Sequence, residues 1–455
     1  MINSDLKMKG SLMGSNCRGW VVSCLFLFTL SACGWWGGDK KQPPLPGKRI
    51  DILQEFGRTE SDRELANTKI IVPTPKNLVN WPQFHANASH NPDHLSFTGQ
   101  PEELWQTNIG LGQDGRHFFL TGPVVANDTV FIVNGNMFVS AIDLNTGRTR
   151  WRLNLKVYGE TDEFTGVGLS VKEDGQILYV ASPFGQIIAL DAKNGKKLWA
   201  TYLAAPIHSS PVLSNKKIFV TTMDGRLVAL EEDTGSILWF YKGSQENPTL
   251  VGSPAAAVAG DIVVVAFNSG EIFGLRAETG QLLWTDSISA SKFGGSVANL
   301  SSIKAGVIID KELVLVINHN SLLVALDLIR GGRQWELQIG SDQTPWIAGD
   351  NLFILTDRKE LLAIQRGSGR VYWSKSLSDF LDKKQTKQDV HWFGPVIAQE
   401  NLIITNSLGE ILYLSPQDGH LISKQKVNNG FVMAPIIVNN IMLLTIKNGS
   451  IIAFK

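Results

Sequence analysis

Side chains suited to metal binding or catalysis are few in this chain, and histidine is the first to consider. Three of the eight histidines cluster in one polar stretch, at His85, His90 and His94. A zinc site needs three or four ligands at a suitable spacing, held in place by further hydrogen bonds. The spacing of these three matches no standard zinc pattern, so we expect a polar loop and no metal site. The other five are scattered along the chain: His117, His208, His319, His391 and His420.

Motifs for covalent, nucleotide or haem chemistry are missing from the sequence. There is no Gly-x-Ser-x-Gly nucleophile elbow, no phosphate-binding Gly-x-x-x-x-Gly-Lys loop and no Cys-x-x-Cys-His haem site. The formal net charge is zero, without the basic excess typical of nucleic-acid binding. These observations predict a protein that is not an enzyme and that needs no cofactor.

The cysteines lie close to the N-terminus, and one of them indicates a different chemistry. The chain has three, Cys17, Cys24 and Cys33, and a basic start followed by a short apolar run, Trp20–Leu30. The run ends in Leu-Ser-Ala-Cys, which resembles the lipobox of bacterial lipoproteins. That resemblance implies cleavage before Cys33 and attachment of acyl chains such as palmitate to it. An ordinary secretory signal with an incidental cysteine is the alternative.

A repeated eleven-residue pattern, with a period of roughly 45 residues, organises the rest of the chain. An alternating apolar run leads into a polar turn with glycine, and tryptophan follows four residues after the glycine. The seventh copy has serine in place of the tryptophan. The copies are Ala141–Trp151, Ala189–Trp199, Ala229–Trp239, Gly274–Trp284, Ala325–Trp335, Ala363–Trp373 and Tyr413–Ser423.

Each copy predicts two antiparallel strands joined by a tight turn. Alternation of apolar and polar residues is typical of a half-buried strand, and the invariant glycine indicates a positive φ in the turn. Tryptophan offers a large apolar face to bury and one N–H group for a backbone carbonyl. We therefore expect packing between neighbouring units at Trp105, Trp151, Trp199, Trp239, Trp284, Trp335 and Trp373.

Counting the strands predicts how the repeat closes on itself. A strand often led by proline precedes each copy and occurs eight times, and another strand lies between it and the copy. With the two strands of the copy itself, each unit is a four-stranded antiparallel meander. The last unit stops at Lys455 before its fourth strand, and Glu103–Ile109 supplies the missing one. We expect an all-β fold, an eight-bladed β-propeller closed by its N-terminal strand. The predicted divisions are a signal peptide (1–32), a lipidated flexible tether (33–79) and the propeller (80–455).

The repeat resembles the Ala-x-Asp-x-x-Thr-Gly-x-x-x-Trp blade motif of pyrroloquinoline-quinone propellers. That resemblance raises one alternative function, a periplasmic quinoprotein dehydrogenase. Such enzymes typically carry an adjacent cysteine pair near the quinone, and residues 34–455 contain no cysteine. The motif therefore indicates blade packing rather than cofactor binding.

The lipobox, the tether and the eight units together resemble the BamB family, the propeller lipoproteins of the outer-membrane β-barrel assembly machinery. The resemblance implies a non-catalytic periplasmic scaffold that docks on the barrel-inserting subunit BamA and aids the assembly of unfolded outer-membrane proteins. Gly34, following the lipidated cysteine, implies the outer membrane rather than the inner one. A propeller that serves another envelope complex is a further alternative, because a fold does not determine a function.

In that family the docking surface lies on loops that enter neighbouring blades. The matching positions here are Leu250 and Val251 in the first loop, and Ser301 and Ser302 in the second. The family pattern has an arginine in the first loop and acidic residues in the second, and this sequence has neither. The resemblance thus implies the place of the partner-binding surface but not its salt bridges.

Overall fold

The computed structural model describes residues 59–65, 68–97, 102–112, 122–155, 168–207, 209–244, 254–288, 303–319, 322–382, 385 and 388–455. All of them belong to one compact unit, Gly57–Lys455. Strands dominate, and three short 3-10 helices accompany them: η1 (Arg63–Leu65), η2 (Phe84–Ala86) and η3 (Leu377–Phe380). Within the described ranges, no helix has the length and apolar character needed to cross a membrane.

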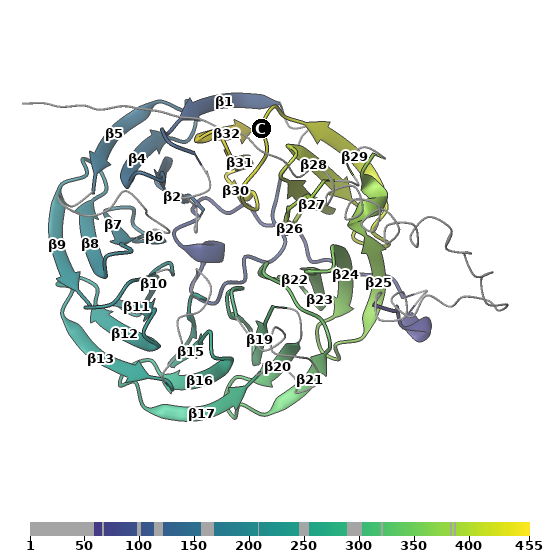
Figure 1. Cartoon of the computed structure of the whole chain (residues 1–455), viewed down its shortest axis with the longest axis horizontal. Coiled ribbons are helices and arrows are strands. Elements are labelled where there is room, and N and C mark those ends of the chain that lie inside the picture. The colour runs from purple at the N-terminus through teal and green to yellow at the C-terminus, as the bar shows by residue number, and fades with distance from the viewer. Residues whose placement is uncertain are drawn as a thin grey trace, which may run out of the picture. The chain divides into compact units, whose positions relative to one another are not determined.

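Eight four-stranded antiparallel sheets are arranged as the blades of a β-propeller (Figure 1). The predicted fold class is confirmed. Blades are numbered here in chain order. Blade 1 is β2 (Val124–Ala126), β3 (Thr129–Val133), β4 (Phe138–Asp143) and β5 (Thr149–Asn154); blade 2 is β6 (Gly168–Val171), β7 (Ile177–Ala181), β8 (Gln186–Asp191) and β9 (Lys197–Tyr202); blade 3 is β10 (Val212–Ser214), β11 (Lys217–Thr222), β12 (Arg226–Glu231) and β13 (Ile237–Lys242); blade 4 is β14 (Ala257–Ala259), β15 (Ile262–Ala266), β16 (Glu271–Arg276) and β17 (Leu282–Ser287).

The second half of the chain repeats the same order. Blade 5 is β18 (Ile308–Asp310), β19 (Leu313–Ile317), β20 (Leu323–Asp327) and β21 (Arg333–Leu337); blade 6 is β22 (Trp346–Ala348), β23 (Asn351–Leu355), β24 (Glu360–Gln365) and β25 (Val371–Ser376); blade 7 is β26 (Trp392–Ala398), β27 (Asn401–Asn406), β28 (Glu410–Leu414) and β29 (Leu421–Lys426); blade 8 is β30 (Ile436–Val438), β31 (Ile441–Ile446), β32 (Ser450–Phe454) and β1 (Glu103–Asn108).

Burial within a blade follows from its position between two neighbours. The second and third strands are buried on both faces, as in β3, where all five residues are buried. They therefore read as continuous apolar runs such as Thr129–Val133. The fourth strand lies on the rim and alternates between exposed and half-buried residues, as β5 and β9 do. The apolar run before each turn glycine, which the sequence predicts to be half-buried, is the third strand and is instead buried on both faces, as in β4 and β8.

Strand β1 closes the ring by completing blade 8. It pairs with β32 in antiparallel register, with Trp105 opposite Ala453 and Asn108 opposite Ser450. Backbone hydrogen bonds between Glu102 and Lys455, in both directions, extend the pairing to the end of the chain. The ring therefore has no unpaired edge between its first and last strands, as strand counting predicts.

The chain just before the ring differs from the extended tether expected up to residue 79. Among the described residues, Leu65 and Ile70 are buried against the propeller, and the Ile70 backbone exchanges two hydrogen bonds with the side-chain amide of Gln417. Arg370 forms ion pairs with Asp62 and Glu64. These contacts fall on single residues at irregular spacing, so they produce no periodicity that a sequence pattern reveals.

Candidate functional site

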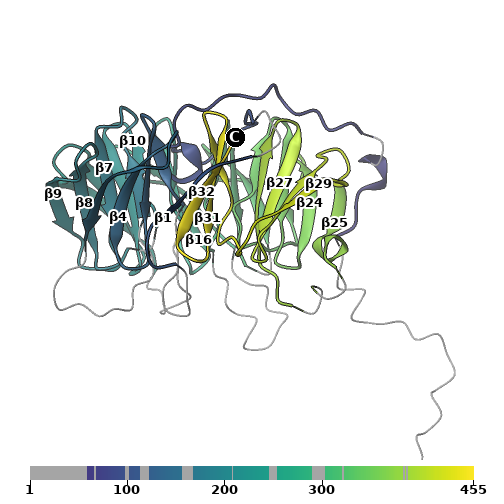
Figure 2. The ribbon, with the colours of Figure 1, turned by 90° about the horizontal axis from the view of Figure 1, so that it is seen from above.

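One stretch of chain, Leu78–Ser96, crosses the middle of the propeller, and we call it the hub segment. In Figure 2 the purple trace of the N-terminal region follows one face of the blades. The hub segment is hydrogen-bonded to the first strand of each blade, or to the turn after it. In order from blade 1 to blade 8, the pairs are Trp81 with Val125, Pro82 with Val171, Gln83 with Leu213, Ala88 with Val258, Ser89 with Ile309, Asp93 with Trp346, Leu95 with Ile397, and Leu78 with Asn439.

These contacts have a common physical cause. The first strand of a blade has a partner on one side only, so its other edge presents backbone N–H and C=O groups towards the centre of the ring. Buried backbone groups without a partner are costly, and the hub segment supplies partners for them. Gln83 does so with its side chain, whose amide both accepts from the Leu213 N–H and donates to its carbonyl. Blade 6 differs in that the indole Nε1 of Trp346 donates to the Asp93 carbonyl.

The three clustered histidines belong to this segment. His90 and His94 each have hydrogen-bond partners of their own, whereas His85 packs against the rings of Phe84 and Trp346 and its buried Nδ1 has no hydrogen-bond partner. His90, which is 1% exposed, donates from Nδ1 to the Val307 carbonyl at 2.6 Å. Burial lowers the pKa of His90 to about 4, so the ring is neutral near pH 7. His94 contacts the Pro73 carbonyl through Nδ1 and accepts from the Glu400 N–H through Nε2. Their roles are in packing the hub rather than in forming a common ligand set.

A cavity of about 280 Å³ lies between the hub segment and the starts of the first strands. Its aromatic lining includes Trp81, Phe84 and Trp346, with Trp81 and Trp346 stacked at 6.4 Å between ring centroids. Lys304 and Asp342 supply the charged part of the described lining, and they are paired with each other at 2.9 Å. The cavity is thus small and of mixed polarity.

This lining does not fit pyrroloquinoline quinone. The quinone is a polycarboxylate and needs free cationic groups, and its calcium ion needs several oxygen ligands. Among the described lining residues, Lys304 is the one lysine or arginine and is already paired with Asp342, the one carboxylate, so this lining offers no unpaired cationic group and too few oxygen ligands. We therefore assign no step of quinone chemistry to this cavity.

The predicted tryptophans lie on the rim, where each reaches from one blade to the next. Trp105 shows the arrangement: its Nε1 donates to the Leu144 carbonyl at 2.8 Å, and its ring lies against the turn glycine Gly147. That glycine has φ +70, and a Cβ there would lie 2.6 Å from the ring, so both the conformation and the space require glycine. The other six contacts are Trp151–Gly195, Trp199–Gly235, Trp239–Gly280, Trp284–Gly331, Trp335–Gly369 and Trp373–Gly419.

The remaining predicted site residues lie outside the described ranges. These are the lipidation candidate Cys33 and the partner-binding candidates Leu250, Val251, Ser301 and Ser302. The described chain resumes at Pro254 before β14, and at Ile303, fully buried, before β18. The two candidate loops therefore enter blades 4 and 5, which are neighbours in the ring.

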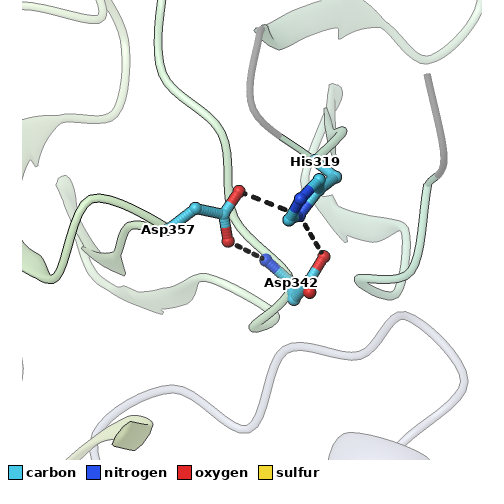
Figure 3. A group of neighbouring side chains, drawn as sticks. All are labelled: His319, Asp342 and Asp357. Carbon is cyan, nitrogen blue, oxygen red and sulfur yellow. Dashed lines mark hydrogen bonds and ion pairs between the residues drawn. The ribbon is translucent and has the colours of Figure 1, made fainter. Parts of the chain in front are cut away.

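The structure also gathers a set of side chains that the sequence leaves scattered. His319, from the hairpin after β19, lies beside Asp342 and Asp357 of the neighbouring blade (Figure 3). No local sequence pattern predicts this group, because its three members come from separate turns of the chain.

Comparison with known families decides between the two kinds of propeller that this repeat resembles. The family model described as outer membrane protein assembly factor BamB matches residues 136–375, more than half of the chain. This chain belongs to the BamB family. A relative from Yersinia pestis with that name is 26% identical over 358 residues, covering 78% of this chain and 88% of the relative. The Escherichia coli relative is 25% identical, with 77% and 88% covered.

Solved structures agree on the fold and leave the function open. The crystal structure of BamB from Moraxella catarrhalis matches with a TM-score of 0.65 at 18% identity, covering 78% of this chain and all of that one. A quinohemoprotein alcohol dehydrogenase from Comamonas testosteroni matches almost as well, with a TM-score of 0.63 at 12% identity and coverage of 83% and 80%. Similarity of fold thus does not separate BamB from the dehydrogenases, whereas the family model does.

Proposed function

We propose that this protein is a scaffold of the outer-membrane β-barrel assembly machinery, docked on the barrel-inserting subunit BamA, and aids the assembly of unfolded outer-membrane proteins. The alignment with relatives named BamB over 88% of their own length carries this proposal. A rigid ring that presents loops suits a scaffold, because rigid elements hold binding loops in place. The mismatch between the cavity lining and an anionic quinone supports a non-catalytic role.

The proposed location is the periplasmic face of the outer membrane. Cys33 would carry the acyl chains, and the chain between Cys33 and the ring would link them to the propeller. Several acyl chains hold a protein at a membrane where one chain does not. Mass spectrometry of the mature protein tests this part directly, and an unmodified Cys33 would contradict it.

The proposed docking surface consists of the loops before β14 and β18, with Leu250, Val251, Ser301 and Ser302. The described chain resumes at Pro254, shortly before β14, and at Ile303, shortly before β18. Blades 4 and 5 are adjacent in the ring, which supports a single docking surface built from both loops. Without the arginine and acidic residues of the family pattern, apolar and hydroxyl groups would make the contacts here.

Charge substitution in the first loop tests this surface. We expect Leu250→Asp with Val251→Asp to weaken binding to purified BamA at least about tenfold, because an interface centre does not tolerate unpaired charge. Ile329→Asp is the matched control: Ile329 is an apolar residue, 63% exposed, in the turn after β20 on the rim of blade 5. Unchanged affinity in the double variant would remove this loop from the interface.

The scaffold role itself needs a separate experiment. Affinity purification of the lipidated protein from detergent-solubilised envelopes should recover the barrel-inserting subunit. Recovery of a different envelope complex, with the barrel-inserting subunit missing, would favour a propeller that serves another assembly.

A further inference from the structure

Two carboxylates converge on one imidazole nitrogen where blade 5 meets blade 6. His319 Nδ1 lies 2.8 Å from Asp342 Oδ1 and 3.2 Å from Asp357 Oδ2. Figure 3 shows the imidazole between the two acidic side chains. A single N–H proton can serve two acceptors only by dividing one hydrogen bond between them, so a proton satisfies this arrangement poorly.

The backbone around the three side chains is tightly held. Ser341, which is fully buried, joins the segments that carry them: its N–H donates to the Asn318 carbonyl and its hydroxyl donates to the Leu355 carbonyl. The Asp342 N–H donates to Asp357 Oδ1 at 3.0 Å, which orients that carboxylate. The donor atoms are therefore positioned before any ligand binds, as good metal sites require.

Comparison among the eight blades shows that blade packing does not require these residues. The hairpin between the second and third strands has the same register in every blade, as in the pairs Ile317 with Leu323 and Leu355 with Leu361. His319 and Asp357 occupy the same position of this hairpin, two residues after the paired residue of the second strand. In blades 1, 2, 3, 4, 7 and 8 that position holds Gly135, Pro183, Met223, Asn268, Ser407 and Lys447.

The donor spacing suits a first-row divalent metal ion. With metal–ligand distances of about 2.1 Å, neighbouring donors lie about 3.0 Å apart in octahedral geometry and about 3.4 Å apart in tetrahedral geometry. The two N···O distances of 2.8 and 3.2 Å require shifts of only a few tenths of an ångström. One imidazole and two carboxylates form a mixed nitrogen and oxygen set that Zn²⁺ accepts, with water completing the coordination.

We propose that His319, Asp342 and Asp357 bind a divalent transition-metal ion, with Zn²⁺ as the probe, and that the ion links blade 5 to blade 6. Side-chain exposures of 27%, 32% and 14% leave an access route for the ion and its water ligands. Lys304, at 2.9 Å from Asp342 Oδ2, orients that carboxylate and offsets part of its charge. Asp342 also lines the central cavity, so the ion would lie beside the cavity wall. This site does not depend on the scaffold role proposed above.

Titration of the full-length, detergent-solubilised protein tests the site. The protein should carry no polyhistidine tag and should first be dialysed against a chelator. We expect calorimetry with Zn²⁺ to show one ion bound per chain at micromolar concentration, and Zn²⁺ to raise the Tm. His319→Ala and the isosteric Asp357→Asn should each weaken this binding at least about tenfold and abolish the rise in Tm.

His420→Ala is the matched control, because His420 pairs with one carboxylate among the described residues, Asp418 at 2.6 Å, where His319 pairs with two. We expect this variant to bind Zn²⁺ as the unchanged protein does. Far-ultraviolet circular dichroism and the Tm in chelator show whether each variant is folded. Failure of the unchanged protein to bind Zn²⁺ below millimolar concentration would overturn the proposal, as would undiminished binding in a folded His319→Ala variant.

Discussion

Seven of the eight interfaces between blades are alike at the rim, and the eighth is different. From blade 8 through blade 1 to blade 7, a tryptophan of one blade packs on the turn glycine of the next. Between blades 7 and 8 the exposed Ser423 stands where tryptophan does elsewhere. Blade 8 also has no turn glycine to receive a ring, since its third and fourth strands come from opposite ends of the chain.

At this eighth interface, residues at the end of the hub segment contact both blades. Leu95 is bridged to Ala398 of blade 7, while Ser96 donates to the Asn440 side chain of blade 8. Leu95 and Phe97 are both almost fully buried there. The segment that precedes the closing strand β1 thus joins blade 7 to blade 8. The comparison shows that the same tryptophan–glycine pair recurs at seven rim interfaces, whereas each blade meets the hub segment through a different residue.

Of the changes that test this comparison, removal of the closing strand should affect the protein most. Deletion of Glu103–Asn108 leaves the edge of β32 unpaired, and an exposed edge strand recruits other chains. We expect aggregation, seen by size-exclusion chromatography with light scattering. Deletion of residues 59–65, which lie outside the ring, should leave a monomer. A monodisperse, cooperatively unfolding protein without β1 would contradict closure by this strand.

Truncation of one rim tryptophan should show how much more a tryptophan interface contributes to stability than the interface that has serine at that position. Trp284 is 7% exposed and donates to the Leu328 carbonyl at 2.8 Å. Trp284→Ala should lower the free energy of unfolding by about 3–5 kcal/mol through the cavity that it leaves. Ser423→Ala, at the equivalent position of the eighth interface, should change it by less than about 0.5 kcal/mol. Urea unfolding of both variants measures the difference, and equal losses would show the interfaces to be equivalent.

Acidification should weaken the hub more than the rim. Burial lowers the pKa of His90 to about 4 in the folded chain, whereas the pKa of an unburied histidine, as in the unfolded chain, is 6.5. The unfolded chain therefore takes up this proton first, and stability is full above pH 6.5 and falls as the pH drops towards 4. The loss approaches about 1.4 kcal/mol per pH unit, or about 3 kcal/mol across the window.

His90→Phe tests that assignment, because phenylalanine cannot take up the proton. We expect the slope of unfolding free energy against pH to decrease by about one proton between pH 6.5 and 4. Urea unfolding at several pH values measures the slope. An unchanged slope would show that the titrating group lies elsewhere.

The smallest effect should come from the contact between Ile70, in the chain before the hub segment, and Gln417 of blade 7. Gln417 both accepts from and donates to the Ile70 backbone, so Gln417→Ala should release that segment locally. We expect faster hydrogen exchange at the Ile70 amide, with the free energy of global unfolding changed by less than about 0.5 kcal/mol. Gln334→Ala on the exposed rim is the control. Unaltered exchange at Ile70 would show that the segment is held by other contacts.

The sequence alone predicts the fold, and the reason is local. Alternating strands, turn glycines and tryptophans recur at each blade because each blade meets the same neighbours, so patterns such as Ala141–Trp151 reappear along the chain. Counting these patterns also predicts that Trp105 belongs to the last blade, which the pairing of β1 with β32 confirms. The candidate partner-binding residues and Cys33 remain predictions, since they lie outside the described ranges.

Only the tertiary structure decided the path of the hub segment and the meeting of His319 with Asp342 and Asp357. The hub follows the centre of a ring, where each blade presents its first strand at a different angle, so its contacts have no repeat in sequence. His319 and Asp357 occupy the same position in successive hairpins, and they meet because the packing of blade 5 against blade 6 brings those hairpins together. Contacts that depend on the curvature of the ring leave no local pattern, because the residues involved are far apart along the chain.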